Sequence, residues 1–221
     1  MLKTHILDKI KNNKQIEVKI KNIIFDLGNV VIDIDPDLTI SKFKELGVSD
    51  FDKMYTIMRQ SDVFDRLDTG KITMPEFRQA IRDFAGIQLA EAQIDEAWCA
   101  MLLDFPEENP ELLRKLRSAG YKLYLLSNTN QMHIDCYTEY MYRQFGCNLL
   151  TELFDRVFYS QEIGFRKPDR ESYEYVLKAE GLKPHETLFI DDLEKNVIGA
   201  QKAGIFAYQH IKGISLVNLF M

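Results

Sequence analysis

Four short groups of polar residues, far apart along the 221-residue chain, carry the side chains needed to transfer a phosphoryl group. They are Asp26, the triplet Ser127-Asn128-Thr129, the run Arg166-Lys167-Pro168-Asp169 and the pair Asp191-Asp192. A carboxylate can act as a nucleophile, and several carboxylates together bind a hard divalent cation. A serine hydroxyl, backbone amides and a lysine ammonium can hold an anionic phosphate. The set therefore fits phosphoryl transfer to an aspartate.

Each group also has a purely structural interpretation when it is taken alone. Asp26 could cap a following helix, and so could the Ser127 triplet. The Lys167-Pro168 pair could form a surface turn, and Asp191-Asp192 could belong to a solvated loop. The occurrence of all four in one chain, in this order, favours a shared site.

Three of the groups directly follow segments that we expect to be strands. These segments are Ile23–Phe25, Tyr121–Leu126 and Thr187–Ile190. Each is an apolar run without alternation, which is typical of a strand buried on both faces of a parallel sheet. Since ligands of open parallel sheets bind beside the carboxyl ends of the strands, we expect the three groups to converge there.

Strands and helices alternate along the second half of the chain, with further strands expected at Arg156–Tyr159 and Ile205–Tyr208. This alternation predicts an α/β fold with a doubly wound, parallel, five-stranded sheet. Residues 33–105 instead have a helical period and little strand character. We therefore expect an N-terminal extension at 1–20, a core of residues 21–32 and 106–221, and a helical cap, residues 33–105, inserted into that core.

The overall composition limits the possible partners. The formal net charge is −6 and no long basic run occurs, which argues against nucleic acid. A membrane-spanning helix needs about 18 consecutive apolar residues, and no stretch approaches this length. No signal peptide is evident. The three cysteines, Cys99, Cys136 and Cys147, share no CxxC spacing, so we expect neither a disulfide framework nor a zinc site. We expect a cytoplasmic monomer or homodimer that acts on a small molecule.

The four groups resemble the motifs of the haloacid dehalogenase (HAD) superfamily, over residues 19–212. The matching segments are Phe25-Asp26-Leu27-Gly28-Asn29-Val30, Leu126-Ser127-Asn128-Thr129, Arg166-Lys167-Pro168-Asp169, and Phe189-Ile190-Asp191-Asp192 with Asn196. The resemblance implies that Asp26 is the nucleophile and that Ser127 and Lys167 hold the phosphoryl group. It also implies a Mg²⁺ site made by Asp26, the Gly28 carbonyl and Asp192, with Asp191 beside it. We place Gly28, Asn29 and Asn128 at the phosphate-binding site as well.

Most members of this superfamily are phosphatases, although its name refers to dehalogenation. Displacing a halide needs no cation, whereas a transferring phosphoryl group needs its charge neutralised. The pair Asp191-Asp192 therefore favours a Mg²⁺-dependent phosphatase that acts on a small phosphorylated metabolite such as a sugar phosphate. A 2-haloacid dehalogenase-type hydrolase is the alternative enzyme.

Gly28 departs from the superfamily pattern. HAD phosphatases usually carry a second aspartate at this position, two residues after the nucleophile, as general acid and base. Such help is typically worth about 10²–10⁴-fold in rate. Its loss leaves three alternatives open: another acid, a substrate with a good leaving group, or a non-catalytic phosphate-binding protein. The variant Asp-Leu-Gly-Asn-Val resembles the subgroup that includes α-D-glucose-1-phosphate phosphatase, and an anomeric oxygen leaves readily.

Two further features are candidates for contact with the substrate. His133 lies shortly after the Ser127 triplet. In the cap, the polar turn from Arg59 to Arg66 interrupts the helical period and concentrates hydrogen-bonding groups, so we expect it to face the substrate.

Overall fold

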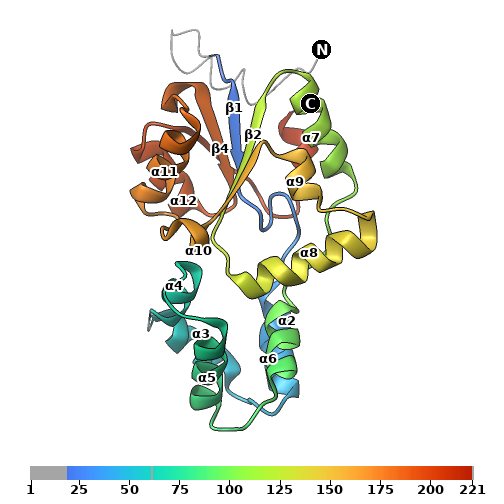
Figure 1. Ribbon diagram of the computed structural model, residues 1–221, viewed down its shortest axis with the longest axis vertical. Helices are drawn as coiled ribbons and strands as arrows, with labels where there is room; N and C mark the ends of the chain where they lie inside the picture. The colour runs from blue at the N-terminus through green and yellow to red at the C-terminus, as the bar shows by residue number, and fades with distance from the viewer. Residues whose placement is uncertain (1–18, 61, 221) are drawn as a thin grey trace.

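The computed structural model describes residues 19–60 and 62–220. Within them, five parallel strands form one sheet in the order β3-β2-β1-β4-β5 (Figure 1). The strands are β1 (Asn22–Phe25), β2 (Lys122–Ser127), β3 (Arg156–Tyr159), β4 (Thr187–Asp191) and β5 (Phe206–Gln209). The predicted doubly wound parallel sheet is confirmed. The N-terminal extension expected at 1–20 lies outside the described residues except for its last two positions.

Strand β1 lies at the centre of the sheet, and its register brings the polar groups together. Phe25 is paired with Leu125 of β2 on one side and with Ile190 of β4 on the other. The chain proceeds from β1 to β2 and β3 on one side, while β4 and β5 are added on the other. The carboxyl end of β1 is therefore the switch point of the topology, where ligands of such sheets bind.

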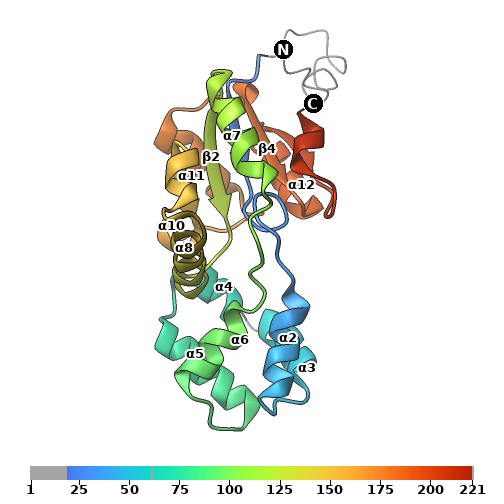
Figure 2. The same ribbon diagram turned by 90° about the vertical axis from the view of Figure 1, so that its right-hand side faces the viewer.

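Helices cover both faces of the sheet (Figures 1 and 2). They are α7 (Glu108–Ser118), α8 (Gln131–Phe145), α9 (Leu149–Leu153), α10 (Ser160–Ile163), α11 (Arg170–Glu180) and α12 (Glu194–Lys202). Side chains of β1 point alternately to the two sides: Ile23 and Phe25 pack in the cluster with α7 and α9, and Ile24 packs with α11 and α12. No helix among residues 19–60 and 62–220 is long and apolar enough to cross a membrane.

Five helices lie together beyond the carboxyl ends of the strands, at the bottom of Figures 1 and 2, and we call them the cap helices. They are α2 (Pro36–Glu45), α3 (Phe51–Gln60), α4 (Val63–Asp68), α5 (Met74–Ala85) and α6 (Glu91–Cys99). They enclose an apolar cluster of their own, which includes Phe43, Phe77 and Trp98. Helix α4 forms where the sequence suggested a polar turn.

Two short segments connect the cap helices to the sheet, and they lie side by side. The amide of Asp33 donates to the carbonyl of Asp104, and that of Leu103 donates to the carbonyl of Asp33, both at 3.0 Å. Ile34 and Leu102 form an antiparallel bridge between them. The cap boundaries at residues 33 and 105 stay a prediction, but the two connections lie close to these positions.

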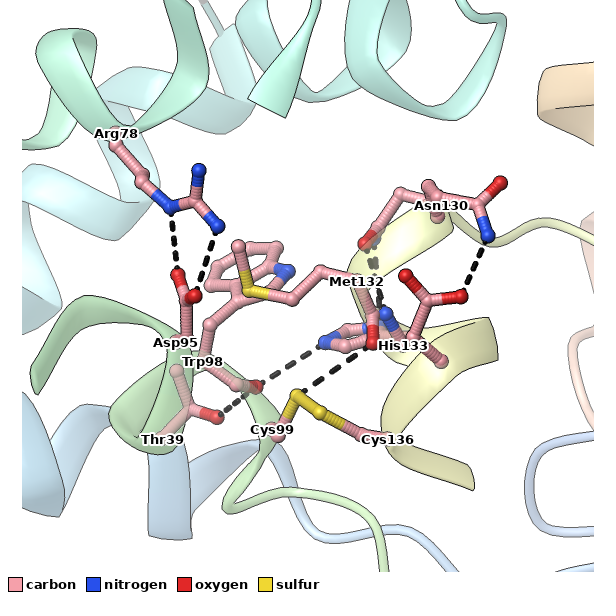
Figure 3. Close-up of a disulfide and its surroundings, with 11 residues drawn as sticks. Thr39, Arg78, Asp95, Trp98, Cys99, Asn130, Met132, His133 and Cys136 are labelled. Carbon is pink, nitrogen blue, oxygen red and sulfur yellow. Dashed lines mark hydrogen bonds and ion pairs between the residues drawn. A yellow bond between two sulfur atoms is a disulfide. The ribbon is translucent and has the colours of Figure 1, made fainter. Parts of the chain in front are cut away.

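A disulfide joins the cap helices to the core, contrary to our expectation from the cysteine count. Cys99, at the end of α6, is bonded to Cys136 in α8, with the two Cα atoms 6.5 Å apart (Figure 3). The two residues are 37 positions apart and meet only because α6 packs against α8. Sequence spacing therefore could not reveal the pair. Cys147 is free, and cysteine usage no longer supports the expectation of a reducing cytoplasm.

Candidate active site

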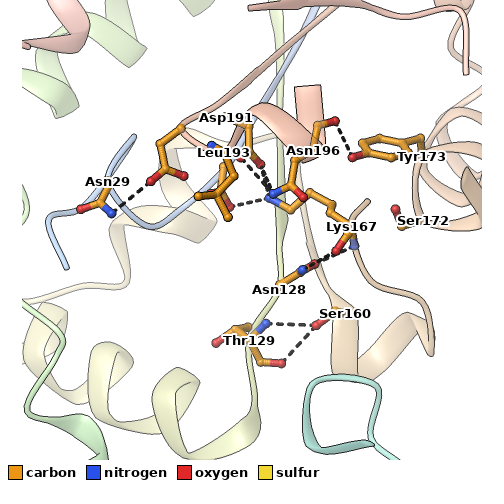
Figure 4. A network of polar contacts seen from close by, with 12 residues as sticks. Asn29, Asn128, Thr129, Ser160, Lys167, Ser172, Tyr173, Asp191, Leu193 and Asn196 are labelled. Carbon is orange, nitrogen blue, oxygen red and sulfur yellow. Dashed lines mark hydrogen bonds and ion pairs between the residues drawn. The ribbon is translucent and has the colours of Figure 1, made fainter. Parts of the chain in front are cut away.

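A buried lysine links two carboxylates at the carboxyl edge of the sheet. The Nζ atom of Lys167 donates to Oδ1 of Asp26 at 2.6 Å and to Oδ2 of Asp191 at 2.7 Å (Figure 4). Asp26 directly follows β1 and Asp191 ends β4, so adjacent strands supply the two acids. Lys167 is only 1% exposed and Asp191 is fully buried. The ion pairs and hydrogen bonds offset the large cost of burying these charges.

The two consecutive aspartates after β4 have different surroundings. The Asp191 carboxylate accepts a hydrogen bond from the backbone amide of Leu193 and is contacted at both oxygens by the Asn196 amide, at 3.0 Å. Asp191 is thereby held in place beneath the site. Asp192 is half-buried and lines the cavity, where its Oδ2 accepts a hydrogen bond from Asn29 at 3.1 Å. It therefore has carboxylate oxygen facing the cavity.

The loop that carries Lys167 is fixed to the end of β2. The Asn128 side chain donates to the Lys167 carbonyl and accepts from the Lys167 amide, both at 2.8 Å. Beside it, the Thr129 amide donates to the hydroxyl of Ser160, the first residue of α10. Ser127 ends β2 and is buried at the cavity. Lys167 and Ser127 thus line the same cavity as Asp26.

The charges at the site match a divalent cation. Asp26, Asp191 and Asp192 each offer an oxygen atom, and the three atoms lie within 4.8 Å of one another. One lysine balances only one of the three negative charges, and oxygen ligands at this spacing suit Mg²⁺. Burial raises the pKa of the Asp26 carboxyl against the opposing effect of Lys167. Burial lowers the pKa of Lys167, but the combined effect of Asp191 and Asp26 is larger and raises that pKa above its usual value.

A cavity of about 560 Å³ opens between this cluster and the cap helices. Its core side contains the catalytic and binding residues predicted from the sequence, namely Asp26, Gly28, Asn29, Ser127, Asn128, Lys167 and Asp192. Its cap side contains aromatic, apolar and acidic residues, namely Tyr55, Phe64, Asp65, Asp68, Trp98 and Met101. Asp191 lies below the surface of the cavity. The structure thus brings the predicted residues together, while their individual roles stay predictions.

His133 also lines the cavity, but its ring stacks on a neighbouring ring and both of its nitrogens face other groups of the protein. The ring stacks on Trp98 with centroids 5.2 Å apart, and its Nε2 lies 3.1 Å from the Trp98 carbonyl (Figure 3). A carbonyl can only accept, so Nε2 carries the hydrogen and the side-chain amide of Asn130 faces Nδ1. Burial lowers the pKa of His133 to about 4.

The polar turn predicted to face the substrate is only partly described. Ser61 and the side chains of Arg59 and Gln60 lie outside the described residues, and Arg66 is exposed away from the cavity. The cap residues that do face the cavity include Asp68 and Trp98, which sequence reasoning missed. Trp98 belongs to the apolar stripe of α6, and Asp68 directly precedes an apparent turn, so neither carried a distinguishing signal.

Fold and site together define a doubly wound α/β enzyme with a carboxylate-rich centre beneath a helical cap. A model of the haloacid dehalogenase-like hydrolase family matches residues 20–204. The chain belongs to this family, as the motifs around Asp26, Ser127, Lys167 and Asp192 suggested.

Similar proteins include phosphatases from bacteria and fungi. A D-ribitol-5-phosphate phosphatase of Bacteroides thetaiotaomicron is 31% identical, over 88% of this chain and 93% of that protein. A sesquiterpene phosphatase of Aspergillus oryzae is 30% identical, over 84% of this chain and 87% of its own. A crystal structure of a HAD family enzyme from B. thetaiotaomicron, complexed with magnesium and inorganic phosphate, has a TM-score of 0.84 and 35% identity; the match covers 91% of this chain and all of that chain.

Proposed function

We propose that the protein is a magnesium-dependent phosphatase that hydrolyses a small phosphorylated sugar or polyol through an aspartyl phosphate on Asp26. The proposal rests on one observation: Asp26, Lys167 and Asp192 converge at one cavity. There, Lys167 donates a hydrogen bond to the carboxylate of the proposed nucleophile. The phosphatases among its relatives support the reaction class.

Each residue then has a defined role. The Asp26 carboxylate attacks phosphorus, and water later attacks the same phosphorus to release inorganic phosphate and regenerate Asp26. Lys167 stabilises the negative charge of the phosphoryl group, and the Ser127 hydroxyl donates to one of its oxygens. Magnesium held by Asp26, Asp192 and the Gly28 carbonyl, with Asp191 beside it, would neutralise the remaining charge.

The two asparagines predicted at the phosphate site fit supporting roles. Asn128 fixes the loop that carries Lys167 through two hydrogen bonds. The amide nitrogen of Asn29 donates to Asp192, and its oxygen accepts from the amide of Ile34 at 3.3 Å. We therefore assign Asn29 to the orientation of the metal ligand Asp192.

The cap side of the cavity favours a polyhydroxylated substrate. Trp98 and Phe64 offer aromatic faces, which suit the C–H surface of a sugar or polyol chain. The carboxylates of Asp65 and Asp68 can accept hydrogen bonds from hydroxyl groups. The relative that acts on D-ribitol 5-phosphate is consistent with this class. The finer resemblance to α-D-glucose-1-phosphate phosphatase stays a prediction.

The two alternative functions make different demands on the site. A 2-haloacid dehalogenase has no need for three carboxylates within 4.8 Å, since the halide leaves without a cation. A non-catalytic phosphate-binding protein would need the anion-binding groups but would not need a carboxylate aimed at phosphorus. The three-carboxylate cluster therefore disfavours a dehalogenase, and the position of Asp26 at the cavity favours a phosphatase over a binding protein.

A screen of phosphorylated metabolites tests the proposal. Phosphate release should occur with at least one sugar or polyol phosphate, should stop when EDTA removes the cation, and should return with added Mg²⁺. Release of halide from 2-chloropropionate that EDTA leaves unchanged would instead establish a dehalogenase. Thermal stabilisation by phosphate esters without any turnover would establish a binding protein.

A further inference from the structure

The place of the missing acid is filled by an apolar side chain. A Cβ atom at Gly28 would lie 2.8 Å from Cδ1 of Ile34, too close for an unshifted contact. A carboxyl group at position 28 would therefore require the end of the Ile34 side chain to shift. An alkoxide leaving group nevertheless needs a proton when the P–O bond breaks.

His133 cannot supply this proton at neutral pH. Its N–H group donates to the Trp98 carbonyl, and its other nitrogen faces the Asn130 amide. Its pKa, lowered to about 4 by burial, keeps the ring neutral. The remaining N–H is thus neither acidic enough nor directed at the cavity.

Asp68, the last residue of α4, lines the same cavity as Asp26 from the cap side. Its side chain is only 18% exposed, and it accepts a hydrogen bond from the side chain of Asn130. Asn130 follows the Ser127 triplet, so Asp68 lies near the phosphate-binding end of β2. Asp68 and Asp26 therefore line one cavity, from the cap side and from the core side.

The burial of Asp68 favours its protonated form. Burial raises the pKa of Asp68 to about 7, against the opposing hydrogen bond from Asn130. The neighbouring His133 is neutral. The Arg166 cation, whose Nη2 is 3.6 Å from Asp68, favours the ionised form and opposes this rise in pKa, but it makes its closer contact with Asp65. Asp65 and, on the core side, Asp169 are exposed.

We propose that Asp68 is the general acid and base of this site, in place of the residue that Gly28 lacks. The inference rests on the proposed phosphatase function. As Asp26 attacks phosphorus and the ester P–O bond breaks, the ester oxygen takes the proton of Asp68 and leaves as an alcohol. The Asp68 carboxylate then accepts a proton from the water that attacks the aspartyl phosphate, so the proton inventory closes after one turnover.

The test compares Asp68→Asn with wild type on substrates that differ in leaving group. With an alkyl phosphate such as D-ribitol 5-phosphate, kcat/KM, which reports phosphoryl transfer to Asp26 and not the later attack of water, should fall on the order of 10²-fold or more. With p-nitrophenyl phosphate, whose phenolate leaves without a proton, kcat/KM should change little. Asn preserves the shape of Asp68 and can still accept from Asn130, so thermal melting should confirm that the variant is folded.

Asp83→Asn is the control, since it removes an exposed carboxylate of α5 that does not line the cavity and should spare the ratio of the two rates. Wild-type kcat/KM on the alkyl phosphate should also fall on the basic side as Asp68 loses its proton, and Asp68→Asn should lack this limb. Equal effects on kcat/KM for both substrates, or an effect that arises from KM alone, would overturn the inference. If wild type hydrolyses none of the phosphate esters in the screen, the phosphatase proposal itself fails.

Discussion

At the scale of single residues, the methyl group Cδ1 of Ile34 occupies the space that a side chain at position 28, beside the nucleophile, would need. The atom closest to a side chain at position 28 is Cδ1 of Ile34, and the next two atoms are 3.4 and 3.7 Å away. Replacing isoleucine by valine removes that atom alone. The described backbone at Gly28 does not have a positive φ, so an L-residue can adopt its conformation.

This geometry predicts a rescue. In the Asp68→Asn background, Gly28→Asp combined with Ile34→Val should restore alkyl phosphate hydrolysis by about tenfold or more, because a new carboxyl group reaches the leaving oxygen. The measurement is the ratio of kcat/KM for D-ribitol 5-phosphate to kcat/KM for p-nitrophenyl phosphate. The ratio cancels losses common to both substrates, such as a weaker hold on the cation.

Gly28→Asn with Ile34→Val is the matched control, since asparagine has the same shape and no proton to give at this pH. Equal recovery with asparagine would show that the effect is packing and not proton transfer. If aspartate at position 28 restores no activity, its carboxyl group does not reach the leaving oxygen, and the predicted rescue is wrong.

At the scale of secondary structure, α8 belongs to the core and also holds the cap helices. Its N-cap residue Asn130 contacts Asp68 of α4, and Met132 packs in the apolar cluster of the cap. Farther along the helix, Cys136 is bonded to Cys99 of α6. The position of Asp68 over the cavity therefore depends on contacts between α8 and the cap.

The disulfide should contribute to the stability of this arrangement. Closing a loop across 37 positions restricts the unfolded chain, which is worth about 2–4 kcal/mol. Cys136→Ser should lower the free energy of unfolding by this amount in urea titrations without reductant. With reductant, wild type and the variant should unfold at the same urea concentration.

Cys147→Ser is the control, because this free cysteine lies outside the disulfide. It should leave the unfolding midpoint unchanged with and without reductant. A wild-type midpoint that does not respond to reductant, and that equals the midpoint of Cys136→Ser, would show that the bond does not form in solution.

At the scale of the whole molecule, the sequence was most informative where local patterns suffice. Apolar runs such as Thr187–Ile190 predicted the strands, and the topology of a parallel sheet then placed the acids that follow them at one edge. The residues of the core side of the site were found in this way. Each lies directly after a strand or in a motif with a recognisable composition.

The features that sequence reasoning missed all depend on how the cap meets the core. The Cys99–Cys136 bond and the burial of Asp68 depend on contacts between segments that are distant in sequence. Burial gives Asp68 its unusual pKa, and no spacing in the sequence encodes that burial. The residues on the cap side of the cavity could therefore be identified only from the structure.

The most direct test of the account is the turnover of Asp26→Asn. Asparagine can still accept the hydrogen bond of Lys167 but cannot form an acyl phosphate, so phosphate release with saturating Mg²⁺ should fall on the order of 10³-fold or more. Asp83→Asn, an exposed position in α5, should retain wild-type turnover. A folded Asp26→Asn enzyme that releases phosphate at the wild-type rate would contradict the assignment of Asp26 as nucleophile.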